Sequence, residues 1–185
     1  MRKKKNSLVG FRSVHDLALA AMLTAMSIVI GMFCKNFLDF GGGLYRVTFE
    51  NLPIILSGIL FGPIVGGIVG SASDWISYFL SGQVYPPNLI VNLGATLVGV
   101  IAGLVSHFLV KKHGYLQLVT AGAAAHIICS MIIKPIGLFA FYGWWVLMRL
   151  PLYLLIAPAE IAVLCMLYKN RTIKKLFGWN NDELH

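Results

Sequence analysis

Ionisable side chains interrupt several long apolar segments of this sequence. They are Glu50, Asp74, His126, Lys134, Arg149 and Glu160. A charged side chain in the middle of a membrane-spanning helix costs about 2.5–3.5 kcal/mol on insertion scales, so such residues mark functional sites. Lys35 and Arg46 lie near the expected outer ends of the segments, and Asn88 and Asn92 begin a later one. We therefore expect most of these groups to meet in one polar site within the outer half of a membrane protein.

The chemistry of this site is predicted to suit a small, aromatic, anionic solute from outside the cell. Trp75 and Tyr78 lie on the same helical face near Asp74, where a flat ring could stack and present its polar edge to the carboxylate. Cations in the same site suit carboxylate groups of a ligand. The candidate substrate-binding residues are Arg46, Glu50, Asp74, Trp75, Tyr78, Asn92, Lys134 and Arg149.

Each of these residues also has a structural alternative. Glu50 follows Arg46 by four positions, a spacing that allows an ion pair at the start of a helix. Lys134 and Arg149 could instead extend toward the outer membrane surface. Asp74 lies too deep for that, so it is either a hydrogen-bonding hub or a ligand contact.

His126 is predicted to be a hydrogen-bonded interior histidine, and Glu160 to lie at a partner surface or in a structural bond. A small intramembrane enzyme with Asp74 and His126 as acid and base is a second hypothesis, which needs the two within hydrogen-bond reach. We predict no catalytic residues, and no His, Cys or Glu spacing indicates a metal site or a bound cofactor. A channel is a third hypothesis, but no helix shows a repeated polar stripe.

The elements that must position these groups follow from composition. The chain has 185 residues, of which 58% are hydrophobic and 12% charged, against about 25% charged in soluble domains. A membrane-spanning helix needs about 20 apolar residues. We predict an all-α membrane protein, a single bundle of six transmembrane helices that uses nearly the whole chain. The expected helices are 14–33, 49–61, 64–80, 89–110, 116–139 and 144–168.

The basic residues orient this bundle. Formal net charge is +8, and the cations cluster in residues 1–13, at Lys111 and Lys112, and in residues 169–185. Cytoplasmic loops are enriched in Lys and Arg, so both termini are predicted to be cytoplasmic, with residues 14–168 forming the bundle. The outer connections are then 34–46, 81–88 and 140–143. In a multi-pass protein of the cell membrane these cations lie in cytoplasmic segments and are not spread over a soluble face, so we expect no nucleic-acid-binding surface.

Small residues at helical spacing predict close helix packing. Ala21 and Ala25 lie on one face of the first helix, which could pack within the bundle or against a partner protein. Gly66 and Gly70, with Gly99 and Gly103, are expected to pack the bundle itself. Gly62 and Pro63 predict a tight turn between the second and third helices.

The stretch 52–63 (LPIILSGILFGP), followed by Gly66, Gly70 and Asp74, resembles the membrane-embedded S-components of energy-coupling factor (ECF) vitamin transporters. The sequence is most similar to the folate family (FolT), and residues 21–25 (AMLTA) match the alanine motif of the family's first helix. The resemblance implies a six-helix vitamin-binding subunit that joins a transmembrane coupling subunit and two ATPases and topples in the membrane to deliver its ligand.

The same resemblance suggests roles for the site residues. Asp74 or Glu50 would face the amino-pyrimidine edge of a pterin, while Arg46, Lys134 or Arg149 would meet glutamate carboxylates. Ala21 and Ala25 would contact the coupling subunit. The fourth helix carries no cation between Leu93 and Gly103, unlike some folate members, so another vitamin such as pantothenate, thiamine or riboflavin remains an alternative.

Overall fold

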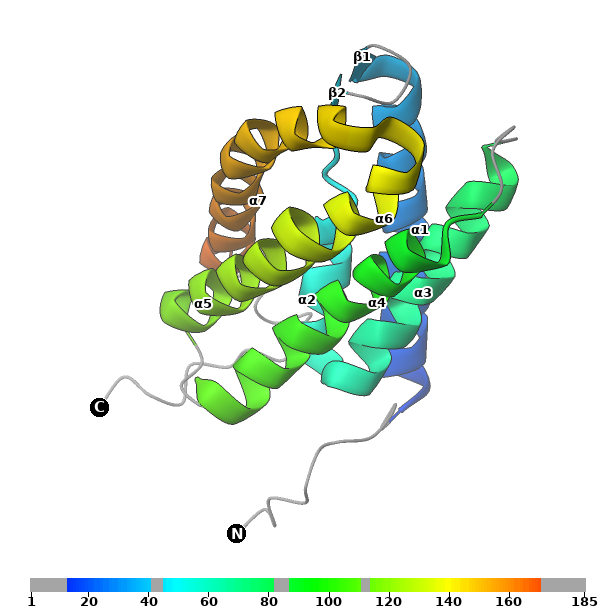
Figure 1. The fold of residues 1–185 in the computed structure, drawn as a ribbon. Coiled ribbons are helices and arrows are strands. Elements are labelled where there is room, and N and C mark those ends of the chain that lie inside the picture. Colours follow the sequence, from blue (N-terminus) through cyan, green and yellow to red (C-terminus); the bar gives the residue numbers. More distant parts are fainter. Residues whose placement is uncertain (1–12, 41–44, 82–86, 111–113, 171–185) are drawn as a thin grey trace, which may run out of the picture.

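The computed structural model describes residues 13–40, 45–81, 87–110 and 114–170, which form a helical bundle (Figure 1). Its α-helices are α1 (Val14–Phe37), α2 (Asn51–Phe61), α3 (Pro63–Leu80), α4 (Leu89–Leu104), α5 (Tyr115–Ala125), α6 (Lys134–Tyr142) and α7 (Leu150–Lys169). Two π-helical segments and one 3-10 helix extend them: η1 (Val105–Leu109), η2 (His126–Ile133) and η3 (Gly143–Arg149).

The described elements agree closely with the predicted ranges, because the apolar runs that define them are long and bounded by polar or glycine-rich segments. Helix α4 continues into η1, helices α5 and α6 are joined by η2, and η3 leads into α7. Three predictions need correction. Residues 140–143, expected in an outer connection, are helical, because α6 runs to Tyr142 and η3 begins at Gly143. Residues 34–37, expected in an outer connection, belong to α1, and the all-α bundle also contains a pair of two-residue strands, β1 (Asp39–Phe40) and β2 (Tyr45–Arg46), which pair antiparallel.

Four helical stretches of the described residues are long and apolar enough to cross a membrane. They are Val14–Phe37, Leu89–Leu109, Tyr115–Phe139 and Gly143–Lys169, and α2 is a shorter apolar helix. Serines and Asp74 within α3 lower its hydropathy. Length and composition therefore support four of the six predicted crossings.

Helix α2 lies at the centre of the bundle, where residues 51–59 are all buried. The core cluster around it includes Leu23, Ile55, Val98 and Leu164, each no more than 1% exposed. A helix surrounded by protein on all sides needs no lipid-facing surface. Its short length is therefore compatible with a place inside a membrane protein.

Glycines bring α2, α3 and α4 into close contact. A Cβ atom built on Gly99 would overlap the carbonyl oxygen of Gly66, and one on Gly70 would overlap that of Ala95. Any side chain at these positions would force the helices apart. The prediction that these glycines pack the bundle itself is confirmed.

The predicted turn between α2 and α3 is also confirmed. Gly62 has φ +95°, a value that favours glycine, and Pro63 begins α3, where its missing N–H leaves no helix hydrogen bond unmade.

Candidate functional site

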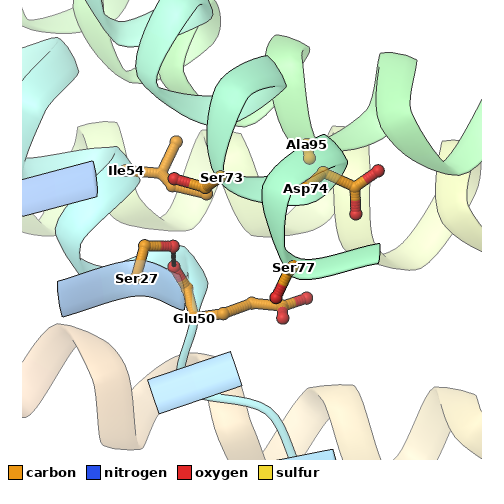
Figure 2. Close-up of a pocket in the computed structure, with 7 residues that line it drawn as sticks. All are labelled: Ser27, Glu50, Ile54, Ser73, Asp74, Ser77 and Ala95. Carbon is orange, nitrogen blue, oxygen red and sulfur yellow. Dashed lines mark hydrogen bonds between the residues drawn. The ribbon is translucent and has the colours of Figure 1, made fainter. Parts of the chain in front are cut away.

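A small hollow lies between α1, α2, α3 and α4 (Figure 2). Its lining residues are Ser27, Glu50, Ile54, Ser73, Asp74, Ser77 and Ala95. The cavity volume is about 10 Å³, close to the space that one water molecule needs. Two carboxylates and three hydroxyls thus surround a narrow space inside an otherwise apolar bundle. Glu50 and Asp74 were predicted site residues, whereas the other five lining residues were not predicted.

Lys134 connects the second half of the chain to this hollow. Its Nζ donates a hydrogen bond to Oδ1 of Asn51 at 2.8 Å and lies 3.8 Å from Oε1 of Glu50. The residue is only 6% exposed, so the alternative in which it extends to the membrane surface is wrong. Gly94 on α4 makes room for its stem, because a Cβ there would lie 2.9 Å from Cγ of Lys134.

Glu50 immediately precedes α2 and is held from two sides. Its backbone carbonyl accepts a hydrogen bond from Oγ of Ser27 at 2.8 Å (Figure 2). Its carboxylate packs against the backbone of α1 at Gly31, where a Cβ would lie 2.8 Å from Oε2. Glycine at this position thus allows a carboxylate to enter the space between α1 and α3.

Asp74 and Asn92 join α3 to α4. Nδ2 of Asn92 donates to Oδ2 of Asp74 at 3.2 Å and to the carbonyl of Ser71 at 3.3 Å. Oγ of Ser71 donates back to Oδ1 of Asn92 at 3.4 Å. Asn92 is therefore the centre of this hydrogen-bonded group, and Asp74 accepts one bond from it while also lining the hollow.

Ser73 and Ser77 present buried hydroxyls to the same hollow. They are 3% and 4% exposed, and neither Oγ has a hydrogen-bond partner among the described residues. Lys35 reaches the end of α3 beside them, where its Nζ donates to the carbonyl of Ser77 at 3.4 Å and to Oγ of Ser81 at 3.2 Å. The sequence signal for these two serines was weak. They lie four positions apart in an apolar segment, with Asp74 between them.

Trp75 and Tyr78 are half-buried and pack on Phe79. The ring of Trp75 stacks on the ring of Phe79 with 5.8 Å between the ring centroids. The ring of Tyr78 meets that of Phe79 edge-on, with 5.6 Å between the centroids. Neither residue is among the seven that line the hollow. Their contact with a solute stays a prediction.

The two predicted arginines are placed only by their backbones. Arg46 lies opposite Asp39 in the backbone register of β1 and β2, and Arg149 is the last residue of η3. Their side chains lie outside the described part of the structure. The predicted contacts of both, including an ion pair between Arg46 and Glu50, are therefore not described by the structure.

His126 and Glu160 form a second buried pair of ionisable side chains. Nε2 of His126 lies 2.6 Å from Oε2 of Glu160, and the side chains are 2% and 0% exposed. Oγ of Ser130 lies 3.3 Å from Nδ1 of His126. The interior-histidine prediction is confirmed, and the alternative that Glu160 lies at a partner surface is wrong. Asp74 bonds to Asn92 instead, which gives the proposed acid–base pair no support.

The alanines predicted to contact a partner lie on the outer face of α1. Ala18, Ala21 and Ala25 are exposed, while Leu19 and Leu23 face the core. The alternative in which these alanines pack inside the bundle is therefore wrong. A partner contact stays a prediction.

Apolar helices around a charged hollow define a multi-pass membrane protein that can bind a polar solute. Residues 15–179 match the sequence profile of the family described as "ECF transporter, substrate-specific component", and the chain belongs to that family. The family is a transporter component whose role is substrate recognition.

Two curated relatives are similar to this chain, and one of them is a named transporter. The chain is 27% identical over 160 residues to the folate transporter FolT of Clostridium novyi (strain NT), covering 72% of this chain and 90% of that protein. It is 35% identical over 95 residues to an uncharacterized Mycoplasma pneumoniae protein, the MG098 homologue; this covers 51% of the chain but only 19% of that protein.

Two solved structures share the fold. The crystal structure of FolT bound with folic acid superposes with a TM-score of 0.67 at 23% identity, covering 88% of this chain and 96% of that chain. The S-component for biotin from an ECF-type ABC transporter superposes with a TM-score of 0.61 at 17% identity, covering 90% of each chain.

Proposed function

We propose that this chain is the substrate-capturing subunit of an ECF-type importer for folate or a closely related vitamin. The observation that carries the proposal is the gathering of Glu50 and Asp74 around one hollow in an apolar bundle, with Lys134 beside Glu50. Burying charged groups is costly unless partners offset the lost hydration. A solute with complementary polar groups supplies such partners, and the named folate relatives indicate which solute to test first.

In this proposal the bundle crosses the cell membrane six times, with both termini in the cytoplasm. The three basic clusters support that orientation. At 1.5 Å per residue, α2 would span only about 16 Å of a hydrocarbon core of about 30 Å. Its burial within the protein supports a crossing in which neighbouring helices, rather than lipid, surround it.

The ligand would place its amino-pyrimidine edge against Asp74 and Glu50 and its carboxylates near the cations. Lys134 already bonds to Asn51 and lies beside Glu50, so it would exchange one of these partners for the ligand. Trp75 and Tyr78 would stack on the flat ring. Arg46, Arg149 and Asn92 complete the proposed contacts.

A vitamin does not fit the hollow at its present size. Pockets for drug-sized ligands have volumes of about 300–1,000 Å³, against about 10 Å³ here. We therefore expect the helices around the hollow to separate when the ligand binds. A difference in shape between free and bound protein is the predicted consequence.

Transport itself would depend on partner proteins. We infer that the chain catalyses no reaction and joins a transmembrane coupling subunit and two ATPases. The exposed face of α1 with Ala21 and Ala25 is the proposed contact, because small side chains allow another helix to approach closely.

Another vitamin is the second candidate, favoured by the fold that the chain shares with the biotin S-component. Pantothenate, thiamine and riboflavin belong to the same test. Purified protein should be denatured and its released small molecules identified by mass spectrometry, followed by calorimetric titration with each vitamin. We expect folate to be released and to bind most tightly. Failure to bind any vitamin at micromolar concentration would contradict the proposal.

A further inference from the structure

Five of the ten serine and threonine hydroxyls in the described helices bond to their own backbone, and three others (Ser27, Ser71 and Ser130) bond to other groups. In the first five, the side-chain oxygen donates to the carbonyl three or four residues earlier, which satisfies the hydroxyl inside an apolar bundle. Such bonds are made by Thr24 to Ala20, Ser57 to Ile54, Thr96 to Asn92, Ser106 to Gly103 and Thr120 to Leu116.

Ser73 and Ser77 depart from this pattern. Both hydroxyls are more than nine-tenths buried and have no partner among the described residues. The two serines are four positions apart and thus lie on one face of α3. Both line the hollow that also contains the side chains of Glu50 and Asp74 (Figure 2). Two adjacent hydroxyls therefore lie unsatisfied at the edge of the candidate binding site.

An unsatisfied buried hydroxyl destabilises a folded protein. A binding site can retain such a group because the ligand completes its hydrogen bonds. A hydroxyl can donate as well as accept, whereas an ionised carboxylate only accepts. The hollow thus offers two donors from serine beside two acceptors from Glu50 and Asp74. A ligand edge that alternates N–H groups with carbonyl or ring-nitrogen acceptors matches this set.

We propose that Ser73 and Ser77 are ligand-binding residues that donate hydrogen bonds to the acceptor atoms of a nitrogen heterocycle, while Glu50 and Asp74 accept from its N–H groups. This inference rests on the proposed vitamin-binding function and assigns the hollow to the ring end of the ligand. The ionised carboxylates of a ligand tail carry no proton donor and would be repelled by Glu50 and Asp74. The tail is therefore placed outside the hollow.

The test compares S73A and S77A with a matched control, S57A. Ser57 is also fully buried, but its Oγ donates to the carbonyl of Ile54 at 2.7 Å and it does not line the hollow. Binding of three compounds to the purified protein is measured by calorimetry or competition: folate, 6-methylpterin as the isolated ring end, and p-aminobenzoylglutamate as the isolated tail. Thermal unfolding of each variant without ligand is measured in parallel.

We expect S73A and S77A each to weaken folate and 6-methylpterin binding by the same factor, about three- to tenfold for one hydrogen bond. Binding of p-aminobenzoylglutamate should not change. The unfolding temperature should stay the same or rise, because an unsatisfied hydroxyl is removed. S57A should lower the unfolding temperature and leave all three affinities unchanged.

Three results would overturn the inference. Wild-type affinities in both serine variants would leave the proposed function standing and remove the serines from the site. A uniform loss for ring and tail together with a lowered unfolding temperature would show a structural role. Wild-type protein that binds none of the three compounds would contradict this inference and the folate assignment together.

Discussion

The ammonium of Lys134 donates a hydrogen bond to the side-chain oxygen of Asn51 over 2.8 Å, although 83 positions separate them. The bond joins the first residue of α6 to the first residue of α2. Glu50, one residue before Asn51, lies 3.8 Å from the same ammonium. A single cation from the second half of the chain thus holds the polar end of the central helix and faces one of the two carboxylates of the hollow.

Removing this cation should affect both stability and binding. We expect K134M to lower the free energy of unfolding by roughly 2–3 kcal/mol, since Glu50 and Asn51 lose a buried partner. Vitamin affinity should fall at least tenfold. Thermal unfolding and calorimetric titration in detergent measure the two effects, with K169M at the exposed end of α7 as the control.

R149Q should weaken vitamin binding without loss of stability. Unchanged affinity in both K134M and R149Q would remove these residues from the site.

The two carboxylates of the hollow should contribute unequally to binding. Glu50 already lies beside Lys134, whereas the described partner of Asp74 is the neutral Asn92. The charge of Asp74 is therefore more available to a ligand N–H group. We expect D74N to reduce vitamin affinity at least tenfold and E50Q to reduce it less, in titrations that include D16N as a control. The reverse order would assign the main contact to Glu50.

The buried pair of His126 and Glu160 should be structural. H126A leaves a fully buried carboxylate without its partner, and we expect a loss of about 3–5 kcal/mol in unfolding free energy. The double variant H126L/E160M should recover much of this loss, because no unpaired charge remains. Neither residue lines the hollow. A double variant that unfolds normally but binds no vitamin would contradict the structural assignment.

Close packing at Gly99 should tolerate no side chain. G99A would place a Cβ in steric overlap with the carbonyl of Gly66 on the neighbouring helix. We expect a loss of about 2 kcal/mol or more, as for other overpacked cores. G114A is the matched control, because a Cβ there would have nothing within 4 Å. Equal unfolding temperatures for the two variants would contradict the packing described for α3 and α4.

The outer face of α1 should matter for assembly and not for ligand capture. We expect A21W/A25W to bind vitamin normally as an isolated subunit and to fail to copurify with the coupling subunit and ATPases. A162W, a tryptophan at an exposed alanine of α7, is the control. Normal copurification and ATP-dependent uptake by A21W/A25W would place the partner contact elsewhere.

Local sequence patterns were sufficient to predict the helices and the glycines at which they pack closely. Apolar runs, the Gly62–Pro63 turn and the spaced glycines reflect burial and steric rules that act over a few residues. The same local chemistry singled out Glu50, Asp74 and Lys134, because charged groups are costly in an apolar segment wherever it packs.

Which of these groups meet depends on contacts between helices that are distant in the sequence. The bond between Lys134 and Asn51, the pairing of His126 with Glu160 and the unsatisfied hydroxyls of Ser73 and Ser77 depend on how distant helices are rotated and placed against one another. The π-helical segment η2 ends at Ile133, directly before Lys134. Local spacing fixes no such rotation, because it results from packing contacts made across the whole bundle.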